Sequence, residues 1–158
     1  MEMKTRKSVM NMFTYGVYIL SAKYKGEYCA SLISMVTQNS IDPLLISVCL
    51  KHSTDTHLLA SKSKHFVLHI PDENQIEFSK SFMKPTSEDK GKLNGYDYKL
   101  NNYNQPIFNE ANVYLECEII DSIDIGDHPL FVAKVNNIVQ RKQVNPLEMR
   151  KVGWTYGH

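Results

Sequence analysis

The sequence predicts a mainly β fold, in the form of a mostly antiparallel barrel with helices inserted between the strands. Apolar runs of strand length outnumber helix-like segments along the 158 residues. Several runs are joined by hairpin-sized turns, of which Lys25-Gly26-Glu27 is an example. Neither GxGxxG nor GxxxxGKS/T occurs, so the motifs of a doubly wound dinucleotide fold and of a P-loop fold are missing.

Length and composition fit one ordinary globular domain, which we expect to span residues 1–158. A chain of 158 residues can bury one core and is too short for two comfortable domains. Hydrophobic residues make up 42% and charged residues 22%, so composition points to no unusual class. The formal net charge of +1 argues against a surface that binds nucleic acid through bulk charge.

Cysteine usage and hydropathy indicate a cytoplasmic protein. Cys29, Cys49 and Cys117 lie far apart in apolar, strand-like runs, which suits buried thiols better than a disulfide framework. No CxxC occurs, so a zinc ribbon or rubredoxin-type iron site within this chain is not expected. The N-terminus has no signal-type apolar region, and no apolar run approaches the roughly 18–20 residues that cross a bilayer.

The first quarter of the chain predicts an N-terminal arm and a hairpin. Residues 1–12 are polar with scattered methionines and suit a short helix or a loose arm. Phe13–Tyr24 is rich in aromatic and β-branched residues and predicts a strand. The Lys25-Gly26-Glu27 turn leads from it into a second apolar strand, Cys29–Val36.

Two polar segments that follow apolar strands are the most informative part of the sequence. Thr37–Ser40 is expected to be a turn, and Asp42-Pro43 breaks the chain before the apolar strand Leu44–Leu50. Lys51–His57 is dense in hydrogen-bond donors and opens a helix at 55–63, with Leu58 and Leu59 expected inside. A lysine, hydroxyls and the free amides of a helix start suit a phosphate. The alternative is that both segments are solvated turns.

The rest of the chain predicts further strands with one short helix. His65–Ile70 suits a strand and Asp72–Phe82 a short helix. Lys84–Gly95 is expected to be a charged, mobile loop, followed by an irregular segment at 96–103. Val113–Ile120 alternates apolar and polar residues, as in a half-buried strand. A turn at 124–129 then leads to the strand at 130–139.

Three histidine patterns suggest chemistry and also have simple structural explanations. His65 and His69 are four residues apart but lack a third metal ligand, so we expect solvent-facing histidines and no metal site. Ser53 lies near His52, but no GxSxG elbow or orienting acid supports a nucleophile. His128 lies on a turn between two long strands, where it could reach a ligand or simply form the turn.

Taken together, these segments resemble the flavin reductase-like family with its FMN-binding split barrel. The resemblance covers roughly residues 10–140. Residues 141–158 would then form a C-terminal tail. The matching pieces, in chain order, are Tyr15-Gly16-Val17-Tyr18, the Gln38 turn, Val48-Cys49-Leu50 with Thr56-His57 six residues later, Glu77-Phe78 with Phe82, and Gly126-Asp127-His128-Pro129-Leu130-Phe131-Val132. The likeness is greatest to the ferric reductases and to the flavin domain of high-molecular-weight rubredoxins.

The resemblance implies a homodimer of split barrels with one FMN per subunit near the dimer interface. By motif, the isoalloxazine ring and ribityl chain would be lined by Ser34, Met35, Thr37 and Gln38. The phosphate would be held by Lys51, His52, Ser53 and Thr56. Phe82 and Lys84 would lie in a mobile segment over the flavin, and His128 would be the catalytic residue near the ring or the nicotinamide.

The function implied is that of an FMN-binding oxidoreductase that takes hydride from NAD(P)H. Electrons would pass on to free flavin, to ferric chelates or to a redox protein such as a rubredoxin. A non-enzymatic FMN carrier reduced only by a protein partner is the alternative, and a barrel for an unrelated small ligand is a third reading. Pro129 replaces the family's usual threonine. Met83-Lys84-Pro85 stands where related chains have a glycine-rich loop, which leaves open whether NADH, NADPH or neither is the donor.

Overall fold

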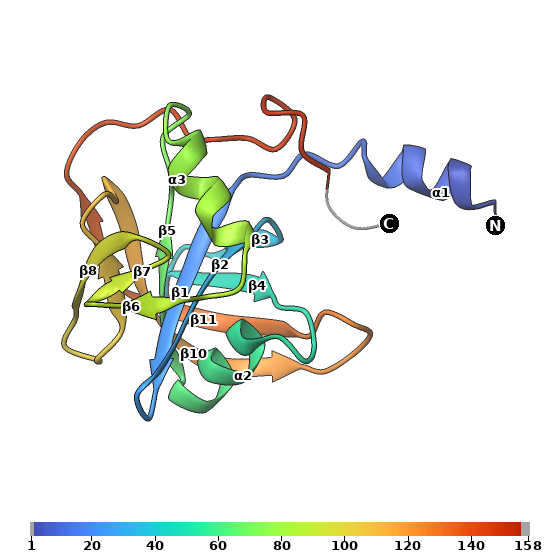
Figure 1. Ribbon diagram of the computed structural model, residues 1–158. Helices are drawn as coiled ribbons and strands as arrows, with labels where there is room; N and C mark the ends of the chain where they lie inside the picture. Colours follow the sequence, from blue (N-terminus) through green and yellow to red (C-terminus); the bar gives the residue numbers. More distant parts are fainter. Residues whose placement is uncertain (1, 156–158) are drawn as a thin grey trace.

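Seven strands form one antiparallel sheet whose two edge strands are consecutive in the chain (Figure 1). The computed structural model describes residues 2–155. Across the sheet, the strands follow the order β2 (Glu27–Ile33), β1 (Tyr18–Tyr24), β5 (His65–His69), β10 (Val113–Ile123), β11 (Leu130–Gln140), β4 (Leu45–Cys49) and β3 (Val36–Ser40).

The sheet has to curl, because only Ser34 and Met35 separate its two edges. β2 ends at Ile33 and β3 begins at Val36, so these two Cα atoms lie at most about 11 Å apart. No ladder joins β2 to β3, and the strands therefore form an incomplete barrel that is open at this seam. The expected mainly β class is confirmed, and this arrangement is compatible with a split barrel.

Helices and a small second sheet cover the barrel. α2 (Asp55–Ser63) packs on β1 and β2, while α1 (Met3–Met10) has no buried residue and stands away from the body (Figure 1). The remaining elements are α3 (Ile76–Lys80), the 3₁₀ turn η1 (Ser81–Met83), β6 (Glu88–Asp89), β7 (Lys92–Leu93), β8 (Tyr96–Leu100) and β9 (Pro106–Phe108).

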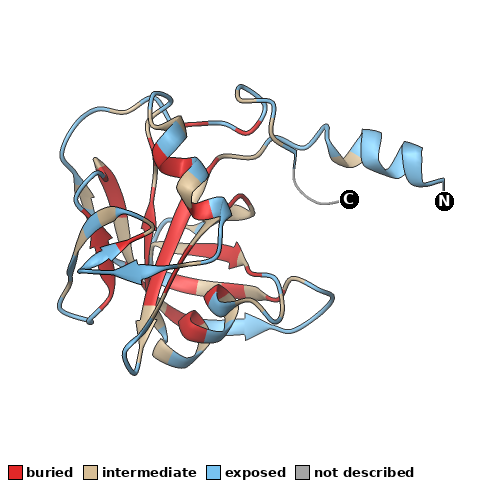
Figure 2. Cartoon of the chain, in the orientation of Figure 1, coloured by how far each residue is buried: buried red, intermediate tan, exposed pale blue. Residues whose placement is uncertain are grey.

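Alternation along the central strands divides the core into two layers (Figure 2). Leu20, Phe66 and Leu68 point into the barrel, whereas Ile19 and Val67 point outward. The outward residues pack against an aromatic cluster on α3, η1 and the small sheet, which consists of Phe78, Phe82, Tyr96 and Phe108. Both faces of the sheet are therefore buried over its centre.

Several expected elements are confirmed. The hairpin turn is made by Lys25 and Gly26, both at positive φ, which suits the twist of the flanking strands. The helix at 55–63 and the turn between β10 and β11 lie where the sequence indicated. The short N-terminal helix is α1.

Other expectations were wrong. Thr37–Ser40 is part of β3 and not a turn, because β4 supplies backbone partners that override its polar composition. The strand expected from Phe13 begins only at Tyr18, and residues 96–100 form strand β8. Leu58 is 44% exposed, so of the leucine pair in α2 only Leu59 is inside.

His69 does not face solvent but is fully buried, because β5 lies between β1 and β10. Its Nδ1–H donates to the Ile19 carbonyl at 3.0 Å, and its Nε2 accepts the Phe108 amide at 3.3 Å. Burial disfavours the charged ring and lowers the His69 pKa to about 4. His65 instead stacks on Tyr103, so the two histidines form no common metal site.

The N- and C-terminal segments pack together. Leu147 and Met149 are buried with Val17 in a third small cluster. Of the expected tail at 141–158, positions 156–158 lie outside the described residues. Within residues 2–155, no helix is long and apolar enough to cross a membrane.

Candidate functional site

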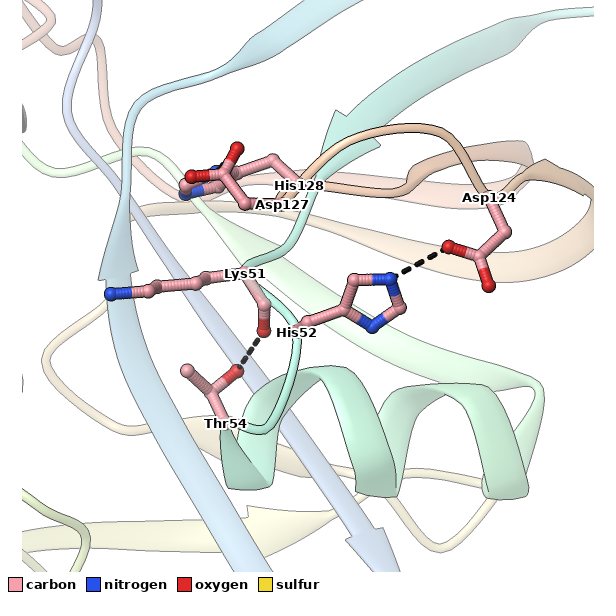
Figure 3. Close-up of polar contacts among 6 residues, drawn as sticks. All are labelled: Lys51, His52, Thr54, Asp124, Asp127 and His128. Atoms are coloured by element: carbon pink, nitrogen blue, oxygen red, sulfur yellow. Dashed lines mark hydrogen bonds and ion pairs between the residues drawn. The ribbon is translucent and has the colours of Figure 1, made fainter.

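The loop between β4 and α2 is closed by Thr54. The Thr54 hydroxyl donates to the Lys51 carbonyl at 2.8 Å and accepts the His57 amide at 3.2 Å as the N-cap of α2 (Figure 3). The first-turn amides of a helix have no partner within the helix. A lysine and a set of unused donors therefore lie at one end of α2, where the helix dipole also favours an anion.

A hydroxyl pair links this helix end to the barrel. Thr56 is 3% exposed, and its Oγ1 lies 2.5 Å from the Oγ of Ser31 on β2. Two hydroxyl groups carry two protons, and one proton is used in the bond between them. The pair therefore retains one O–H, which the neighbouring Cys29 thiol can accept within the protein and which a ligand would compete for.

Two cavities meet at this pair. The smaller, about 80 Å³, and the larger, about 600 Å³, share four lining residues: Ser31, Leu32, Thr54 and Thr56. The smaller is further lined by Ile33, Ser34, Met35, Cys49, Leu50 and Lys51. The larger is further lined by Ser53, Asp55, Phe82, Met83, Lys84, Pro85, Thr86, Met149, Trp154 and Thr155. Together they form one hollow running from the barrel seam to the C-terminal tail.

Ser34 is a buried polar residue at the wall of the smaller cavity. Ser34 is 3% exposed, and its Oγ has no hydrogen-bond partner among residues 2–155. An unpartnered buried hydroxyl is costly. A polar ligand atom in this cavity would supply the missing partner.

His52 points away from both cavities. Its Nε2 lies 2.7 Å from Oδ1 of Asp124 (Figure 3). Its ring lies 4.9 Å from that of His57. Burial is the main reason that the His57 pKa is lowered, with the neighbouring His52 adding to it. His52 thus joins the β10–β11 turn to the start of α2.

His128 lies beside the Lys51 loop. The Asp127 carbonyl accepts the His52 amide at 2.9 Å, which holds the β10–β11 turn against this loop. His128 Nδ1 lies 2.9 Å from Asp127 Oδ1, and this hydrogen bond lowers the Asp127 pKa. The His128 and Lys51 side chains point to the same side of the loop, opposite to His52 (Figure 3).

The structure brings most of the sequence-predicted site residues to one hollow. Those lining it are Ser34, Met35, Lys51, Ser53, Thr56, Phe82 and Lys84. Thr37 and Gln38 are exposed on the edge strand β3 and, like His52 and His128, lie outside both linings. Their roles stay predictions.

Sequence reasoning missed several lining residues. Thr54 could have been found, since a threonine before the helical pattern is a typical N-cap. Ser31 lies within the predicted apolar strand Cys29–Val36, where nothing in the local sequence distinguishes it. Cys49 was expected to be buried but is half-buried at the smaller cavity. Met149 and Trp154 carried no local signal, because they reach the cavity from the far end of the chain.

The fold is an incomplete β-barrel, and the candidate site is a pair of cavities beside the donor-rich start of a helix. In residues 2–155, no three His, Cys, Asp or Glu side chains are grouped so as to hold a metal. A flavin reductase like domain model matches residues 10–154. The chain belongs to this family, and the resemblance inferred from its motifs is confirmed.

Three known proteins illustrate the similarity. The reductase component of 4-nitrophenol 4-monooxygenase/4-nitrocatechol 2-monooxygenase of Rhodococcus opacus is 30% identical over 82% of this chain and 68% of its own length. A ferric-chelate reductase (NAD(P)H) of Archaeoglobus fulgidus is 29% identical over 77% of this chain and 73% of its own. The crystal structure of flavin reductase HpaC complexed with NADP⁺ matches with a TM-score of 0.79 and 26% identity, covering 93% of this chain and 92% of that one.

Proposed function

We propose that this protein is an FMN-binding, NAD(P)H-dependent flavin or ferric reductase. The observation that carries the proposal is the pair of adjoining cavities that extend from the donor-rich start of α2 to the unpartnered Ser34 hydroxyl at the barrel seam. Membership of the flavin reductase family and similarity to proteins named flavin and ferric-chelate reductases support the same activity.

The residues present fit FMN. The phosphate would be held at the start of α2 by charge-assisted hydrogen bonds from Lys51, Ser53 and Thr56. Ser34 would donate to a polar atom of the flavin ring or ribityl chain, which would give its buried hydroxyl a partner. When bound, FMN supplies the redox chemistry, accepting two electrons from NAD(P)H and passing them on.

The protein's own part is positioning and charge. Lys51 would place a positive charge beside the phosphate, and Phe82 would close one wall of the hollow to water. His128, held by Asp127, would either position the nicotinamide or act as a cation near developing negative charge. Hydride transfer from a nicotinamide needs no general base there, so placement is the role expected of His128.

We further propose that the protein acts as a homodimer. The apolar segment from Phe13 to Leu20 and the Val113 strand are the contact surfaces that the sequence suggests, but Val17, Ile19 and Leu20 are buried within the single chain. Large apolar side chains are exposed at the arm and at the β10–β11 end instead: Met12, Phe13, Ile120, Ile123 and Ile125. Burying this surface against a second copy would also help to cover the open seam.

The test is flavin loading followed by anaerobic reduction. We expect the purified protein to bind FMN, with FAD weaker, and NADH or NADPH to bleach the bound flavin. Failure to bind any flavin would refute the proposal. Flavin that binds but is reduced only by a protein such as a rubredoxin would establish the non-enzymatic electron carrier instead.

A further inference from the structure

The C-terminal tail forms an ordered wall of the larger cavity. Val17 donates its amide to the Leu147 carbonyl at 3.0 Å, and Met149 donates its own to Tyr15 at 3.1 Å. Leu147 and Met149 are 1% and 5% exposed. These contacts fix the tail beside the chain that leads into β1, so the residues just after Met149 have a defined place.

Trp154 is the aromatic residue that the tail contributes to the larger cavity. Its amide donates to the Met149 carbonyl at 3.0 Å, and its side chain is half-buried in the same cluster. Both Trp154 and Met149 line the cavity. In Figure 1 the tail lies at the top of the molecule and α2 at the bottom. The tail and α2 therefore approach the cavity from different directions.

The lining of the larger cavity has two chemical parts. Residues 53–56 are polar and adjoin the proposed phosphate site. The apolar part consists of Leu32, Phe82, Met83, Pro85, Met149 and Trp154. Phe82 is 2% exposed and packs edge-on to Phe78 at 5.2 Å, so its ring is already used in the core. Trp154 is thus the aromatic residue of this lining with ring surface left for a ligand.

We propose that Trp154 stacks on the planar heteroaromatic ring of a second ligand that binds beside the flavin. The inference rests on the proposed function and names a ligand class for the tail end of the same site. Stacking on tryptophan suits planar rings of this kind, and a cationic oxidised nicotinamide gains a cation–π contribution. The nicotinamide of NAD(P)H and the ring of a free flavin acceptor share this chemistry.

The surroundings of Trp154 suit a ligand that also carries phosphate. Lys84 is exposed at the cavity and lines an adjoining hollow of about 400 Å³ together with Lys92. These lysines would meet the phosphates of a dinucleotide whose ring lies at Trp154. A volume of about 600 Å³ for the larger cavity is within the range of small-molecule sites.

The experiment measures binding to the oxidised, FMN-loaded protein, so that no turnover is involved. Titration calorimetry gives the Kd of NAD⁺ and of NADP⁺, and equilibrium dialysis gives the Kd of riboflavin as a second flavin. We expect Trp154→Ala to raise the Kd of the cognate ligand about tenfold, which equals about 1.4 kcal/mol. Trp154→Phe retains a ring face and should restore the Kd to within about threefold.

Tyr15→Ala is the matched control. Tyr15 packs in the same cluster but does not line the larger cavity, so its truncation should leave the Kd unchanged if Trp154 itself contacts the ligand. An effect on nicotinamide nucleotides alone assigns the site to the donor, and an effect on riboflavin alone assigns it to the acceptor. An unchanged Kd in FMN-loaded Trp154→Ala, equal weakening by Tyr15→Ala, or no binding of either ligand to the wild type overturns the inference. These outcomes leave flavin loading and reduction intact, and therefore differ from failure of the proposed function.

Discussion

Removing the Thr56 hydroxyl tests the proposed phosphate site most directly. Thr56→Val retains the shape of a residue that is 3% exposed and deletes only the group that lies 2.5 Å from Ser31. The hydroxyl pair has one further proton, for which a ligand would compete, and a hydrogen bond to a charged group contributes about 1.5–3 kcal/mol. We therefore expect the Kd of FMN to rise roughly 10- to 150-fold.

Riboflavin provides the internal control, because it lacks the phosphate. Its Kd should change by no more than about threefold in Thr56→Val, the scale of a small packing change. Thr56→Ser retains the hydroxyl and should bind FMN nearly as well as the wild type. Flavin fluorescence titration at fixed salt measures all of these affinities. Equal losses of FMN and riboflavin affinity in Thr56→Val would show that Thr56 supports the fold of the site and does not contact the phosphate.

Three further predictions follow from the site and the core. His128→Ala should retain FMN but slow anaerobic reduction by NAD(P)H about tenfold or more, and an unchanged rate in stopped flow would end its assignment. The FMN-loaded protein should sediment as a dimer, with Ile123→Lys weakening the association; a monomer at micromolar concentration would contradict this. The pKa of His69 is about 4 in the folded protein, below its value of 6.5 in an unfolded chain. Between these two pH values the unfolded chain binds more protons than the folded one. The free energy of unfolding should therefore fall as the pH drops from about 7 to 4. Urea unfolding should show a loss on the order of 3 kcal/mol in the wild type, with a flatter pH dependence in His69→Gln.

Local interactions explain which parts of the fold the sequence predicts. The β1–β2 turn depends on two adjacent residues that adopt positive φ, and α2 begins at the N-cap Thr54. Both signals involve residues within a few positions of one another, so both can be predicted from the sequence. The donor cluster from Lys51 to Thr56 is equally local, so the sequence alone is enough to propose it as a phosphate site.

The remaining features depend on contacts between distant residues. Polar Thr37–Ser40 is a strand only because β4 pairs with it, and His69 is buried only because β1 and β10 flank β5. The seam at Ser34 exists because β2 and β3 lie at opposite edges of one curled sheet. Trp154 lines the same cavity as the start of α2, although about a hundred residues separate the two in the sequence. Backbone hydrogen bonds between the C-terminal tail and the segment before β1 bring it there. The sequence by itself determined the class of fold and the chemistry of the anion site, since these follow from periodicity and local donors. Tertiary structure alone decided which edges meet, which polar groups are buried and which residues close the hollow, since these follow from the packing of strands far apart in the chain.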